Sequence, residues 1–194
     1  MRTPAILASV ALGCALLAGC SSGGSDAASS SAAPSTGPWA TSDCSAIAPP
    51  QTSATTAEGA VVEGEVATTA DVATAPVISV LEGAVPVTSL VVSDVVAGSG
   101  DAVAAGAEVT VEYCGVGLDS GAIFDSSWAR GAPASFPLAG VIPGWQEGIP
   151  GMQPGGRRLL VIPADLAYGD TPPPGSGIAP GESLVFVVDL VSSP

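Results

Sequence analysis

Apolar and polar side chains alternate in short runs along the second half of the chain, which is the pattern of half-buried antiparallel strands. Residues 108–113 read Glu-Val-Thr-Val-Glu-Tyr, so Val109, Val111 and Tyr113 share one face of a strand. Asp119-Ser120-Gly121 predicts a turn that ends this strand. Further strands are predicted at residues 123–124, 158–163 and 183–190.

One segment has a helical period instead. Within residues 144–152, Trp145, Ile149 and Met152 recur at i, i+4 and i+7, which places them on one face of a short helix. One short helix beside several antiparallel strands predicts an α+β fold, in which a curled antiparallel sheet wraps around that helix.

The first half of the chain is organised differently. Residues 20–57 are rich in Ser, Ala and Thr, and such a segment cannot bury enough apolar surface to offset its ordering entropy, so we predict a disordered tether. Residues 58–84 contain β-branched runs bounded by Gly and Pro. They form either an added strand on the following domain or an ordered part of the tether, and the strand is the favoured reading.

Residues 1–19 have the features of an export signal. Arg2 precedes an apolar run at residues 6–17 that is shorter than the roughly 20 residues needed to span a bilayer. The Leu-Ala-Gly-Cys sequence that ends at Cys20 resembles the lipobox of bacterial lipoproteins. The resemblance implies acylation of Cys20 (a palmitate-type modification) and a location at the outer face of the cytoplasmic membrane. The alternative is an ordinary secretory signal in which Cys20 is a thiol.

Composition excludes several classes of function. The formal net charge is -14, and the only basic side chains are four arginines, so a nucleic acid or an anionic membrane held by charge is excluded. The chain has no histidine, which removes the usual general base and the commonest zinc ligand. We therefore expect no metal and no cofactor.

Five sequence blocks carry a family resemblance. They are FDSS at 124–127, VIPGW at 141–145, GGRR at 155–158, IPADLAYG at 162–169 and LVFVVDL at 184–190. In this order and spacing they resemble the FKBP-type peptidyl-prolyl isomerases (rotamases), which bind macrolides. The resemblance implies one isomerase domain at residues 85–194, with its first strand at 85–96.

The resemblance also implies a pocket for the proline ring of a substrate. Asp125, Tyr168 and Trp145 match the family's catalytic positions, with Trp145 as the floor and Tyr168 as a hydroxyl donor to a ligand carbonyl. Other matched positions are expected to bind substrate: Tyr113, Phe124, Arg130, Val141, Ile142, Ile178 and Phe186. Without these motifs, most of the same apolar residues would be read as ordinary core. Only 4% of the chain is aromatic, so the gathering of its rings at these positions favours the pocket.

The chain departs from the family pattern at one wall of the pocket. Ala134 stands where many members carry a large aromatic residue, which predicts an open wall. This feature favours the alternative function, a non-catalytic lipoprotein that only binds Pro-containing segments. The favoured function is isomerisation of X-Pro bonds in exported proteins by a monomer whose single membrane contact is the lipid anchor, and macrolides are expected inhibitors.

Two further predictions concern charge and cysteine. Arg157 and Arg158 are read as surface charges. Cys44 and Cys114 are candidates for a disulfide outside the reducing cytosol, and the alternative is a buried thiol. Cys114 follows Tyr113 on its strand and therefore points away from the pocket. A disulfide there should stabilise the fold without affecting catalysis.

Overall fold

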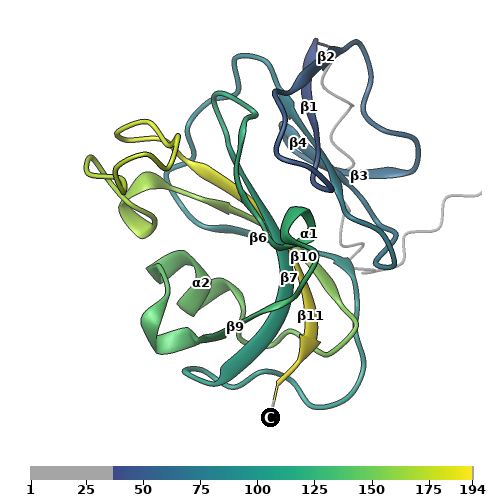
Figure 1. Ribbon diagram of the computed structural model, residues 1–194, viewed down its shortest axis with the longest axis vertical. Helices are drawn as coiled ribbons and strands as arrows, with labels where there is room; N and C mark the ends of the chain where they lie inside the picture. The colour runs from purple at the N-terminus through teal and green to yellow at the C-terminus, as the bar shows by residue number, and fades with distance from the viewer. Residues whose placement is uncertain (1–36, 194) are drawn as a thin grey trace, which may run out of the picture. The chain divides into compact units, whose positions relative to one another are not determined.

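The computed structural model describes residues 37–193, which form two antiparallel sheets and two short α-helices (Figure 1). The predicted signal peptide, Cys20 and the first part of the predicted tether lie outside the described residues. Within residues 37–193, no helix is long and apolar enough to cross a membrane.

A six-stranded sheet forms the centre of the domain. Its strands are β6 (Val91–Val96), β7 (Glu108–Gly117), β8 (Ile123–Ser126), β9 (Ala134–Pro137), β10 (Arg157–Ile162) and β11 (Leu184–Ser192). The order is β6-β10-β11-β7-β8, and β9 also pairs with β7. The strands predicted at 108–113, 158–163 and 183–190 are confirmed. The first strand is shorter than predicted and begins at Val91; Pro86, which lacks a backbone donor, lies in the omitted part.

Two α-helices and two 3-10 turns connect these strands. They are α1 (Ser127–Arg130), η1 (Leu138–Gly140), α2 (Pro143–Gly148) and η2 (Ala164–Leu166). Helix α2 begins with proline at its first position, where no backbone donor is needed. The helix ends before Pro150, earlier than predicted, but Ile149 and Met152 still lie in the core as their spacing indicated.

A second sheet precedes the first one in the chain. Its strands are β1 (Trp39–Asp43), β2 (Gln51–Ser53), β3 (Ala60–Glu63), β4 (Val66–Thr69) and β5 (Val77–Leu81), in the order β2-β1-β5-β4-β3. The predicted disorder is therefore wrong for residues 39–53. Trp39 is only 3% exposed, and all five residues of β1 pair with β5. The extension at 58–84 also contributes three strands instead of one.

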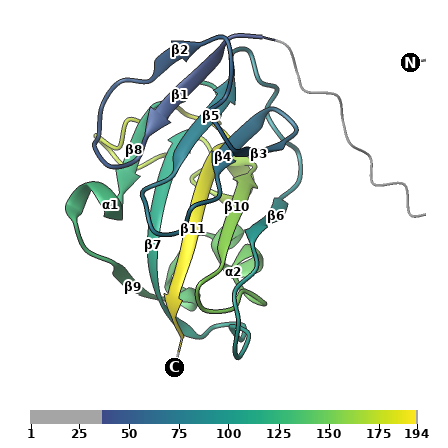
Figure 2. The same ribbon diagram turned by 90° about the vertical axis from the view of Figure 1, so that its right-hand side faces the viewer.

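The two faces of the six-stranded sheet bury separate cores. Val109, Val111 and Tyr113 lie in a core cluster with Trp145, on the face that carries α2. Cys114 and Val116, the alternate residues of β7, lie in a second cluster with side chains of the N-terminal sheet. Figures 1 and 2 show α2 and the N-terminal sheet on opposite faces of the six-stranded sheet.

The first of the two adjacent arginines lies between the sheets and not at the surface. Arg157 is 0% exposed and donates to both carboxylate oxygens of Asp189, at 2.6 and 2.7 Å. It also donates to the backbone oxygens of Thr69 at the end of β4 (2.8 Å) and of Thr74 in the connection between β4 and β5 (2.9 Å). Burial raises the pKa of Asp189, while Arg157 acts in the opposite direction. The prediction of a surface charge is wrong, because the Arg157 side chain is buried between Asp189 and the backbone of the β4–β5 segment.

Its neighbour Arg158 is also buried, at 7% exposure, and its partners are β6 and the end of α2 instead of the N-terminal sheet. It donates to Asp94 on β6 at 2.7 and 3.1 Å, and to the backbone oxygens of Gly148 (2.7 Å) and Pro150 (3.2 Å) at the end of α2. Arg158 therefore links the end of α2 to β6. Its assignment as a surface charge is wrong, because these contacts bury its own side chain.

A disulfide joins the two sheets. Cys44 follows β1 directly, and its sulfur is bonded to that of Cys114 on β7. Both cysteines are fully buried, and the Cys114 side chain faces away from α2, as the strand alternation predicted.

Candidate active site

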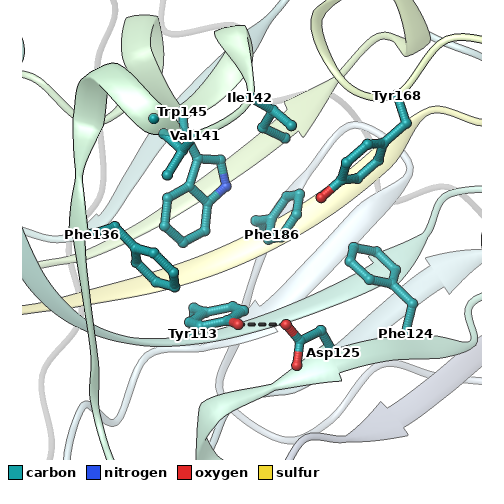
Figure 3. Close-up of a pocket in the computed structure, with 10 residues that line it drawn as sticks. Tyr113, Phe124, Asp125, Phe136, Val141, Ile142, Trp145, Tyr168 and Phe186 are labelled. Atoms are coloured by element: carbon teal, nitrogen blue, oxygen red, sulfur yellow. Dashed lines mark hydrogen bonds between the residues drawn. The ribbon is translucent and has the colours of Figure 1, made fainter. Parts of the chain in front are cut away.

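A cavity of about 320 Å³ opens on the α2 side of the six-stranded sheet (Figure 3). Ten residues line it: Tyr113, Phe124, Asp125, Phe136, Gly140, Val141, Ile142, Trp145, Tyr168 and Phe186. They come from strands β7, β8, β9 and β11, from α2 and its preceding segment, and from the turn after η2. The sequence places them up to 73 positions apart, from 113 to 186, and the curled sheet brings them together.

Aromatic rings form most of the cavity wall. Trp145 is 4% exposed and contacts three other rings edge to face: Tyr113 at 5.4 Å, Phe136 at 5.7 Å and Phe186 at 5.3 Å between centroids. Phe124 contacts Phe186 in the same manner at 5.4 Å. Edge-to-face pairs favour a fixed ring orientation. The rings therefore hold an apolar hollow open instead of filling it.

A glycine on β7, which has no side chain, leaves room for two of these rings. A Cβ atom at Gly115 on β7 would overlap the ring of Phe124 and lie 2.9 Å from that of Phe186. Only glycine lets both rings lie this close to the strand. Gly115 was not among the predicted site residues, although a glycine inside a strand is a recognised sign of close approach.

Charged and hydroxyl groups occupy one end of the cavity. The Tyr113 hydroxyl donates to Asp125 at 2.5 Å, as the dashed line in Figure 3 shows. Arg130 forms an ion pair with the other carboxylate oxygen and donates to the Tyr113 hydroxyl at 2.9 Å. Burial and the hydrogen bond to Asp125 raise the pKa of Tyr113 to about 12. The hydrogen bond with Tyr113 raises the pKa of Arg130.

The short helix α1 delivers Arg130 to Asp125. Ser126 caps the helix by accepting the N–H of Ala129 at 3.2 Å, and Gly131 ends it with a left-handed φ of 75°. A single helical turn after Asp125 thus returns the chain so that the guanidinium group meets the carboxylate.

Tyr168 lies across the cavity from this group. It follows η2, and Figure 3 shows its hydroxyl directed into the cavity. Burial raises the pKa of Tyr168, and the negative charge of Asp125 raises it further. The phenol therefore keeps its proton at neutral pH and is available to donate to a bound carbonyl.

The predicted open wall is wrong. Phe136 lines the cavity on β9, where it contacts Tyr113 at 5.9 Å as well as Trp145. Ala134 lies two residues earlier on the same strand and is also partly buried against the core. The sequence assigned the aromatic position to Ala134, although strand alternation puts Phe136 on the same face.

Two predicted binding residues do not line the cavity. Ile178 packs against the neighbouring core, and Arg130 acts through Asp125 and Tyr113. Gly140, which lines the cavity, carried no signal in the sequence. Among residues 37–193, no cluster of three or more acidic or cysteine side chains is arranged to hold a metal ion.

Comparison with known proteins agrees with this geometry. The family described as FKBP-type peptidyl-prolyl cis-trans isomerase matches residues 100–191. A "Probable FK506-binding protein" of Corynebacterium glutamicum is 53% identical over 105 residues, which cover 54% of this chain and 86% of that protein. The "FKBP-type peptidyl-prolyl cis-trans isomerase FkpA" of Escherichia coli is 48% identical over 104 residues, covering 54% of this chain and 37% of that protein.

Solved structures give the same result. The crystal structure of FkpA from Escherichia coli is 47% identical with a TM-score of 0.50, and the match covers 55% of this chain and 48% of that one. The crystal structure of AtFKBP13 is 34% identical with a TM-score of 0.50, covering 57% of this chain and 97% of that one. The predicted curled sheet around a short helix is thus confirmed, and the chain belongs to the FKBP-type family of peptidyl-prolyl cis-trans isomerases.

Proposed function

We propose that this isomerase acts on X-Pro bonds of exported proteins and assists their folding, with the aromatic cavity as its active site. The observation that carries the proposal is the ring of edge-to-face aromatics around an apolar hollow, with a hydroxyl and a carboxylate at its border. Uncatalysed rotation meets a barrier of about 18–20 kcal/mol, because amide resonance must be broken. A step this slow delays folding.

The mechanism needs no covalent bond and no proton transfer. A twisted amide has lost its resonance and is less polar along C–N than the planar one. An apolar, water-excluding site therefore binds the twisted form more tightly, and this difference lowers the barrier. Trp145 and Phe186 hold the proline ring, while the Tyr168 hydroxyl donates to the substrate carbonyl. Asp125 is fixed by Tyr113 and Arg130 before substrate binds, so its field needs no rearrangement during the reaction.

The cavity also supports a substrate preference. Phe136, Val141 and Ile142 give it an apolar border, so we expect faster turnover when a large apolar residue precedes proline. Macrolides that bind the family should compete for the same space. The alternative of a non-catalytic binding lipoprotein was favoured by an open wall at Ala134, and Phe136 removes that argument.

Substitution of the carboxylate tests the proposal. Asp125→Ala in the full chain should lower the isomerisation rate of an X-Pro peptide by at least about tenfold, because a preorganised charge is removed. Asp119→Ala is the matched control, since it removes an exposed carboxylate from the turn of the same β-hairpin. Equal rates for wild type and Asp125→Ala would overturn the assignment of the site.

We further propose that acylation of Cys20 holds the protein at the outer face of the cytoplasmic membrane, where exported substrates emerge. The lipobox-like sequence supports this location. Anchoring by acyl chains gains about 0.8 kcal/mol for each buried methylene. Cys20→Ser should therefore release the protein from membranes. A Cys20→Ser variant that remains with the membrane fraction after a high-salt wash would contradict the anchor.

A further inference from the structure

The disulfide lies directly behind the polar group of the active site. Cys114 follows Tyr113 on β7, and Ser126 follows Asp125 on β8. Cys114 and Ser126 are cross-strand partners in the β7–β8 register. Tyr113 and Asp125 bond to each other at the cavity, and the residues that follow them meet on the opposite face.

Cys44 holds both members of that rear pair. Its sulfur is bonded to Cys114, and its backbone oxygen accepts a buried 2.7 Å hydrogen bond from the Ser126 hydroxyl. Cys44 is itself fixed in the N-terminal sheet, because its N–H donates to Pro76 just before β5, at 3.1 Å. Figure 2 shows β1, which leads to Cys44, beside β8. The N-terminal sheet thus reaches the strand pair that carries the site.

Ser126 also connects Cys44 to Arg130. Its hydroxyl oxygen caps α1 through Ala129, and α1 ends with Arg130, which binds Asp125. Ser126 is 0% exposed, so no water competes for these bonds. The Ser126 hydroxyl therefore fixes both the end of β8, which carries Asp125, and the start of α1, which carries Arg130.

We propose that Cys44, Cys114 and Ser126 form a positioning unit, through which the N-terminal sheet sets the geometry of Asp125 and Tyr113 for catalysis. The inference rests on the proposed function of the cavity. Displacement of a catalytic group by about 1 Å can lower a rate by up to roughly 100-fold, so small motions of β8 matter. None of the three residues touches substrate, and their effect is expected in kcat and not in KM.

The test compares two hydroxyls that make the same kind of bond. Ser42 on β1 donates to the backbone oxygen of Gly121 at 2.8 Å, and this buried bond links the same sheet to the same hairpin at its far end. Both Ser126→Ala and Ser42→Ala should lower the melting temperature, and Ser126→Ala should lower it more because it also removes the cap of α1. Only Ser126→Ala should lower kcat, by about threefold or more, with KM changed by less than about twofold. Equal kcat values for both variants, or a loss confined to KM, would overturn the inference.

The second experiment removes the disulfide between Cys44 and Cys114. The Cys44→Ser, Cys114→Ser double variant should also lose kcat at a temperature where circular dichroism shows it folded. This outcome differs from the sequence-based expectation that the disulfide affects stability alone, because that expectation did not include the contact of Cys44 with Ser126. Wild type assayed before and after native-state reduction repeats this comparison without a mutation. If every altered form unfolds instead, the unit serves only global stability and the inference fails. Should Asp125→Ala retain the wild-type rate, the proposed site itself falls; if only that variant loses activity, the site stands and the positioning role falls.

Discussion

The two faces of the six-stranded sheet are built from alternate residues of the same strands, yet their chemistry differs. On β7 and β11, Tyr113 and Phe186 point to the cavity, while Cys114 and Val187 point to the N-terminal sheet. The cavity face has rings around an empty space. The rear face has closely packed aliphatic side chains, a disulfide and a buried ion pair.

This difference separates catalysis from stability. Side chains that border a hollow lack contact atoms on one side and lose dispersion energy there. The rear face contains the covalent link and the Arg157 hydrogen bonds, and the cavity face has neither. We infer that the rear face keeps the sheet rigid enough for the cavity to stay open. The family match covers residues 100–191, so strands β1–β5 of this support lie outside it.

The largest expected effect tests the rear face. Arg157→Ala leaves the buried Asp189 carboxylate without its partner and removes the bonds to two backbone oxygens, so the free energy of unfolding should fall by about 3–5 kcal/mol. Urea denaturation followed by circular dichroism measures it. The double variant Arg157→Met, Asp189→Leu removes both charges and should be less destabilised than Arg157→Ala. A loss below about 1 kcal/mol for Arg157→Ala would mean that Arg157 does not join the two sheets.

Reduction of the disulfide is the next largest effect. Cys44 and Cys114 are 70 residues apart, for which the chain-entropy model gives about 4 kcal/mol as a ceiling. Thermal unfolding of the oxidised and reduced forms measures the loss. Peptide mapping after thiol alkylation without reductant provides the control: alkylation of both cysteines would show that no bond exists.

The sequence predicted the cavity face far better than the rear face. Strand alternation placed Tyr113 on the cavity, and the family motifs placed Phe124, Trp145 and Phe186 there, because both signals are local in the sequence. The error at Phe136 was a shift of two residues along β9, which a period of two cannot detect.

The rear face depends on contacts between distant segments. Arg157 is buried because it meets backbone oxygens at Thr69 and Thr74, which lie 88 and 83 positions away. No local pattern encodes such acceptors. Strand β1 reads Trp-Ala-Thr-Ser-Asp, a composition close to that of the predicted tether, and it is ordered by its pairing with β5. Pairing of this kind overrides weak local preference.

A smaller effect is expected at the wall that the sequence misplaced. Phe136→Ala should lower kcat/KM by about tenfold for peptides with a bulky residue before proline, since about 1.4 kcal/mol of apolar contact is lost. Peptides with alanine before proline should be affected less. Ala134→Ser, on the same strand, is the control and should change neither rate by more than about twofold. Equal losses for Phe136→Ala and Ala134→Ser would place the wall elsewhere.

The smallest expected effect comes from one hydroxyl of the cavity face. Tyr168→Phe removes a neutral hydrogen bond worth about 0.5–1.5 kcal/mol, so kcat/KM should fall between about two- and tenfold. Burial and the charge of Asp125 raise the pKa of Tyr168, and a phenol keeps its proton below its pKa. The ratio of wild-type to Tyr168→Phe rates should therefore stay constant from about pH 6 to about pH 9, below the ordinary tyrosine pKa of about 10. A ratio that falls to one within this range would mean that Tyr168 ionises there and does not act as the donor.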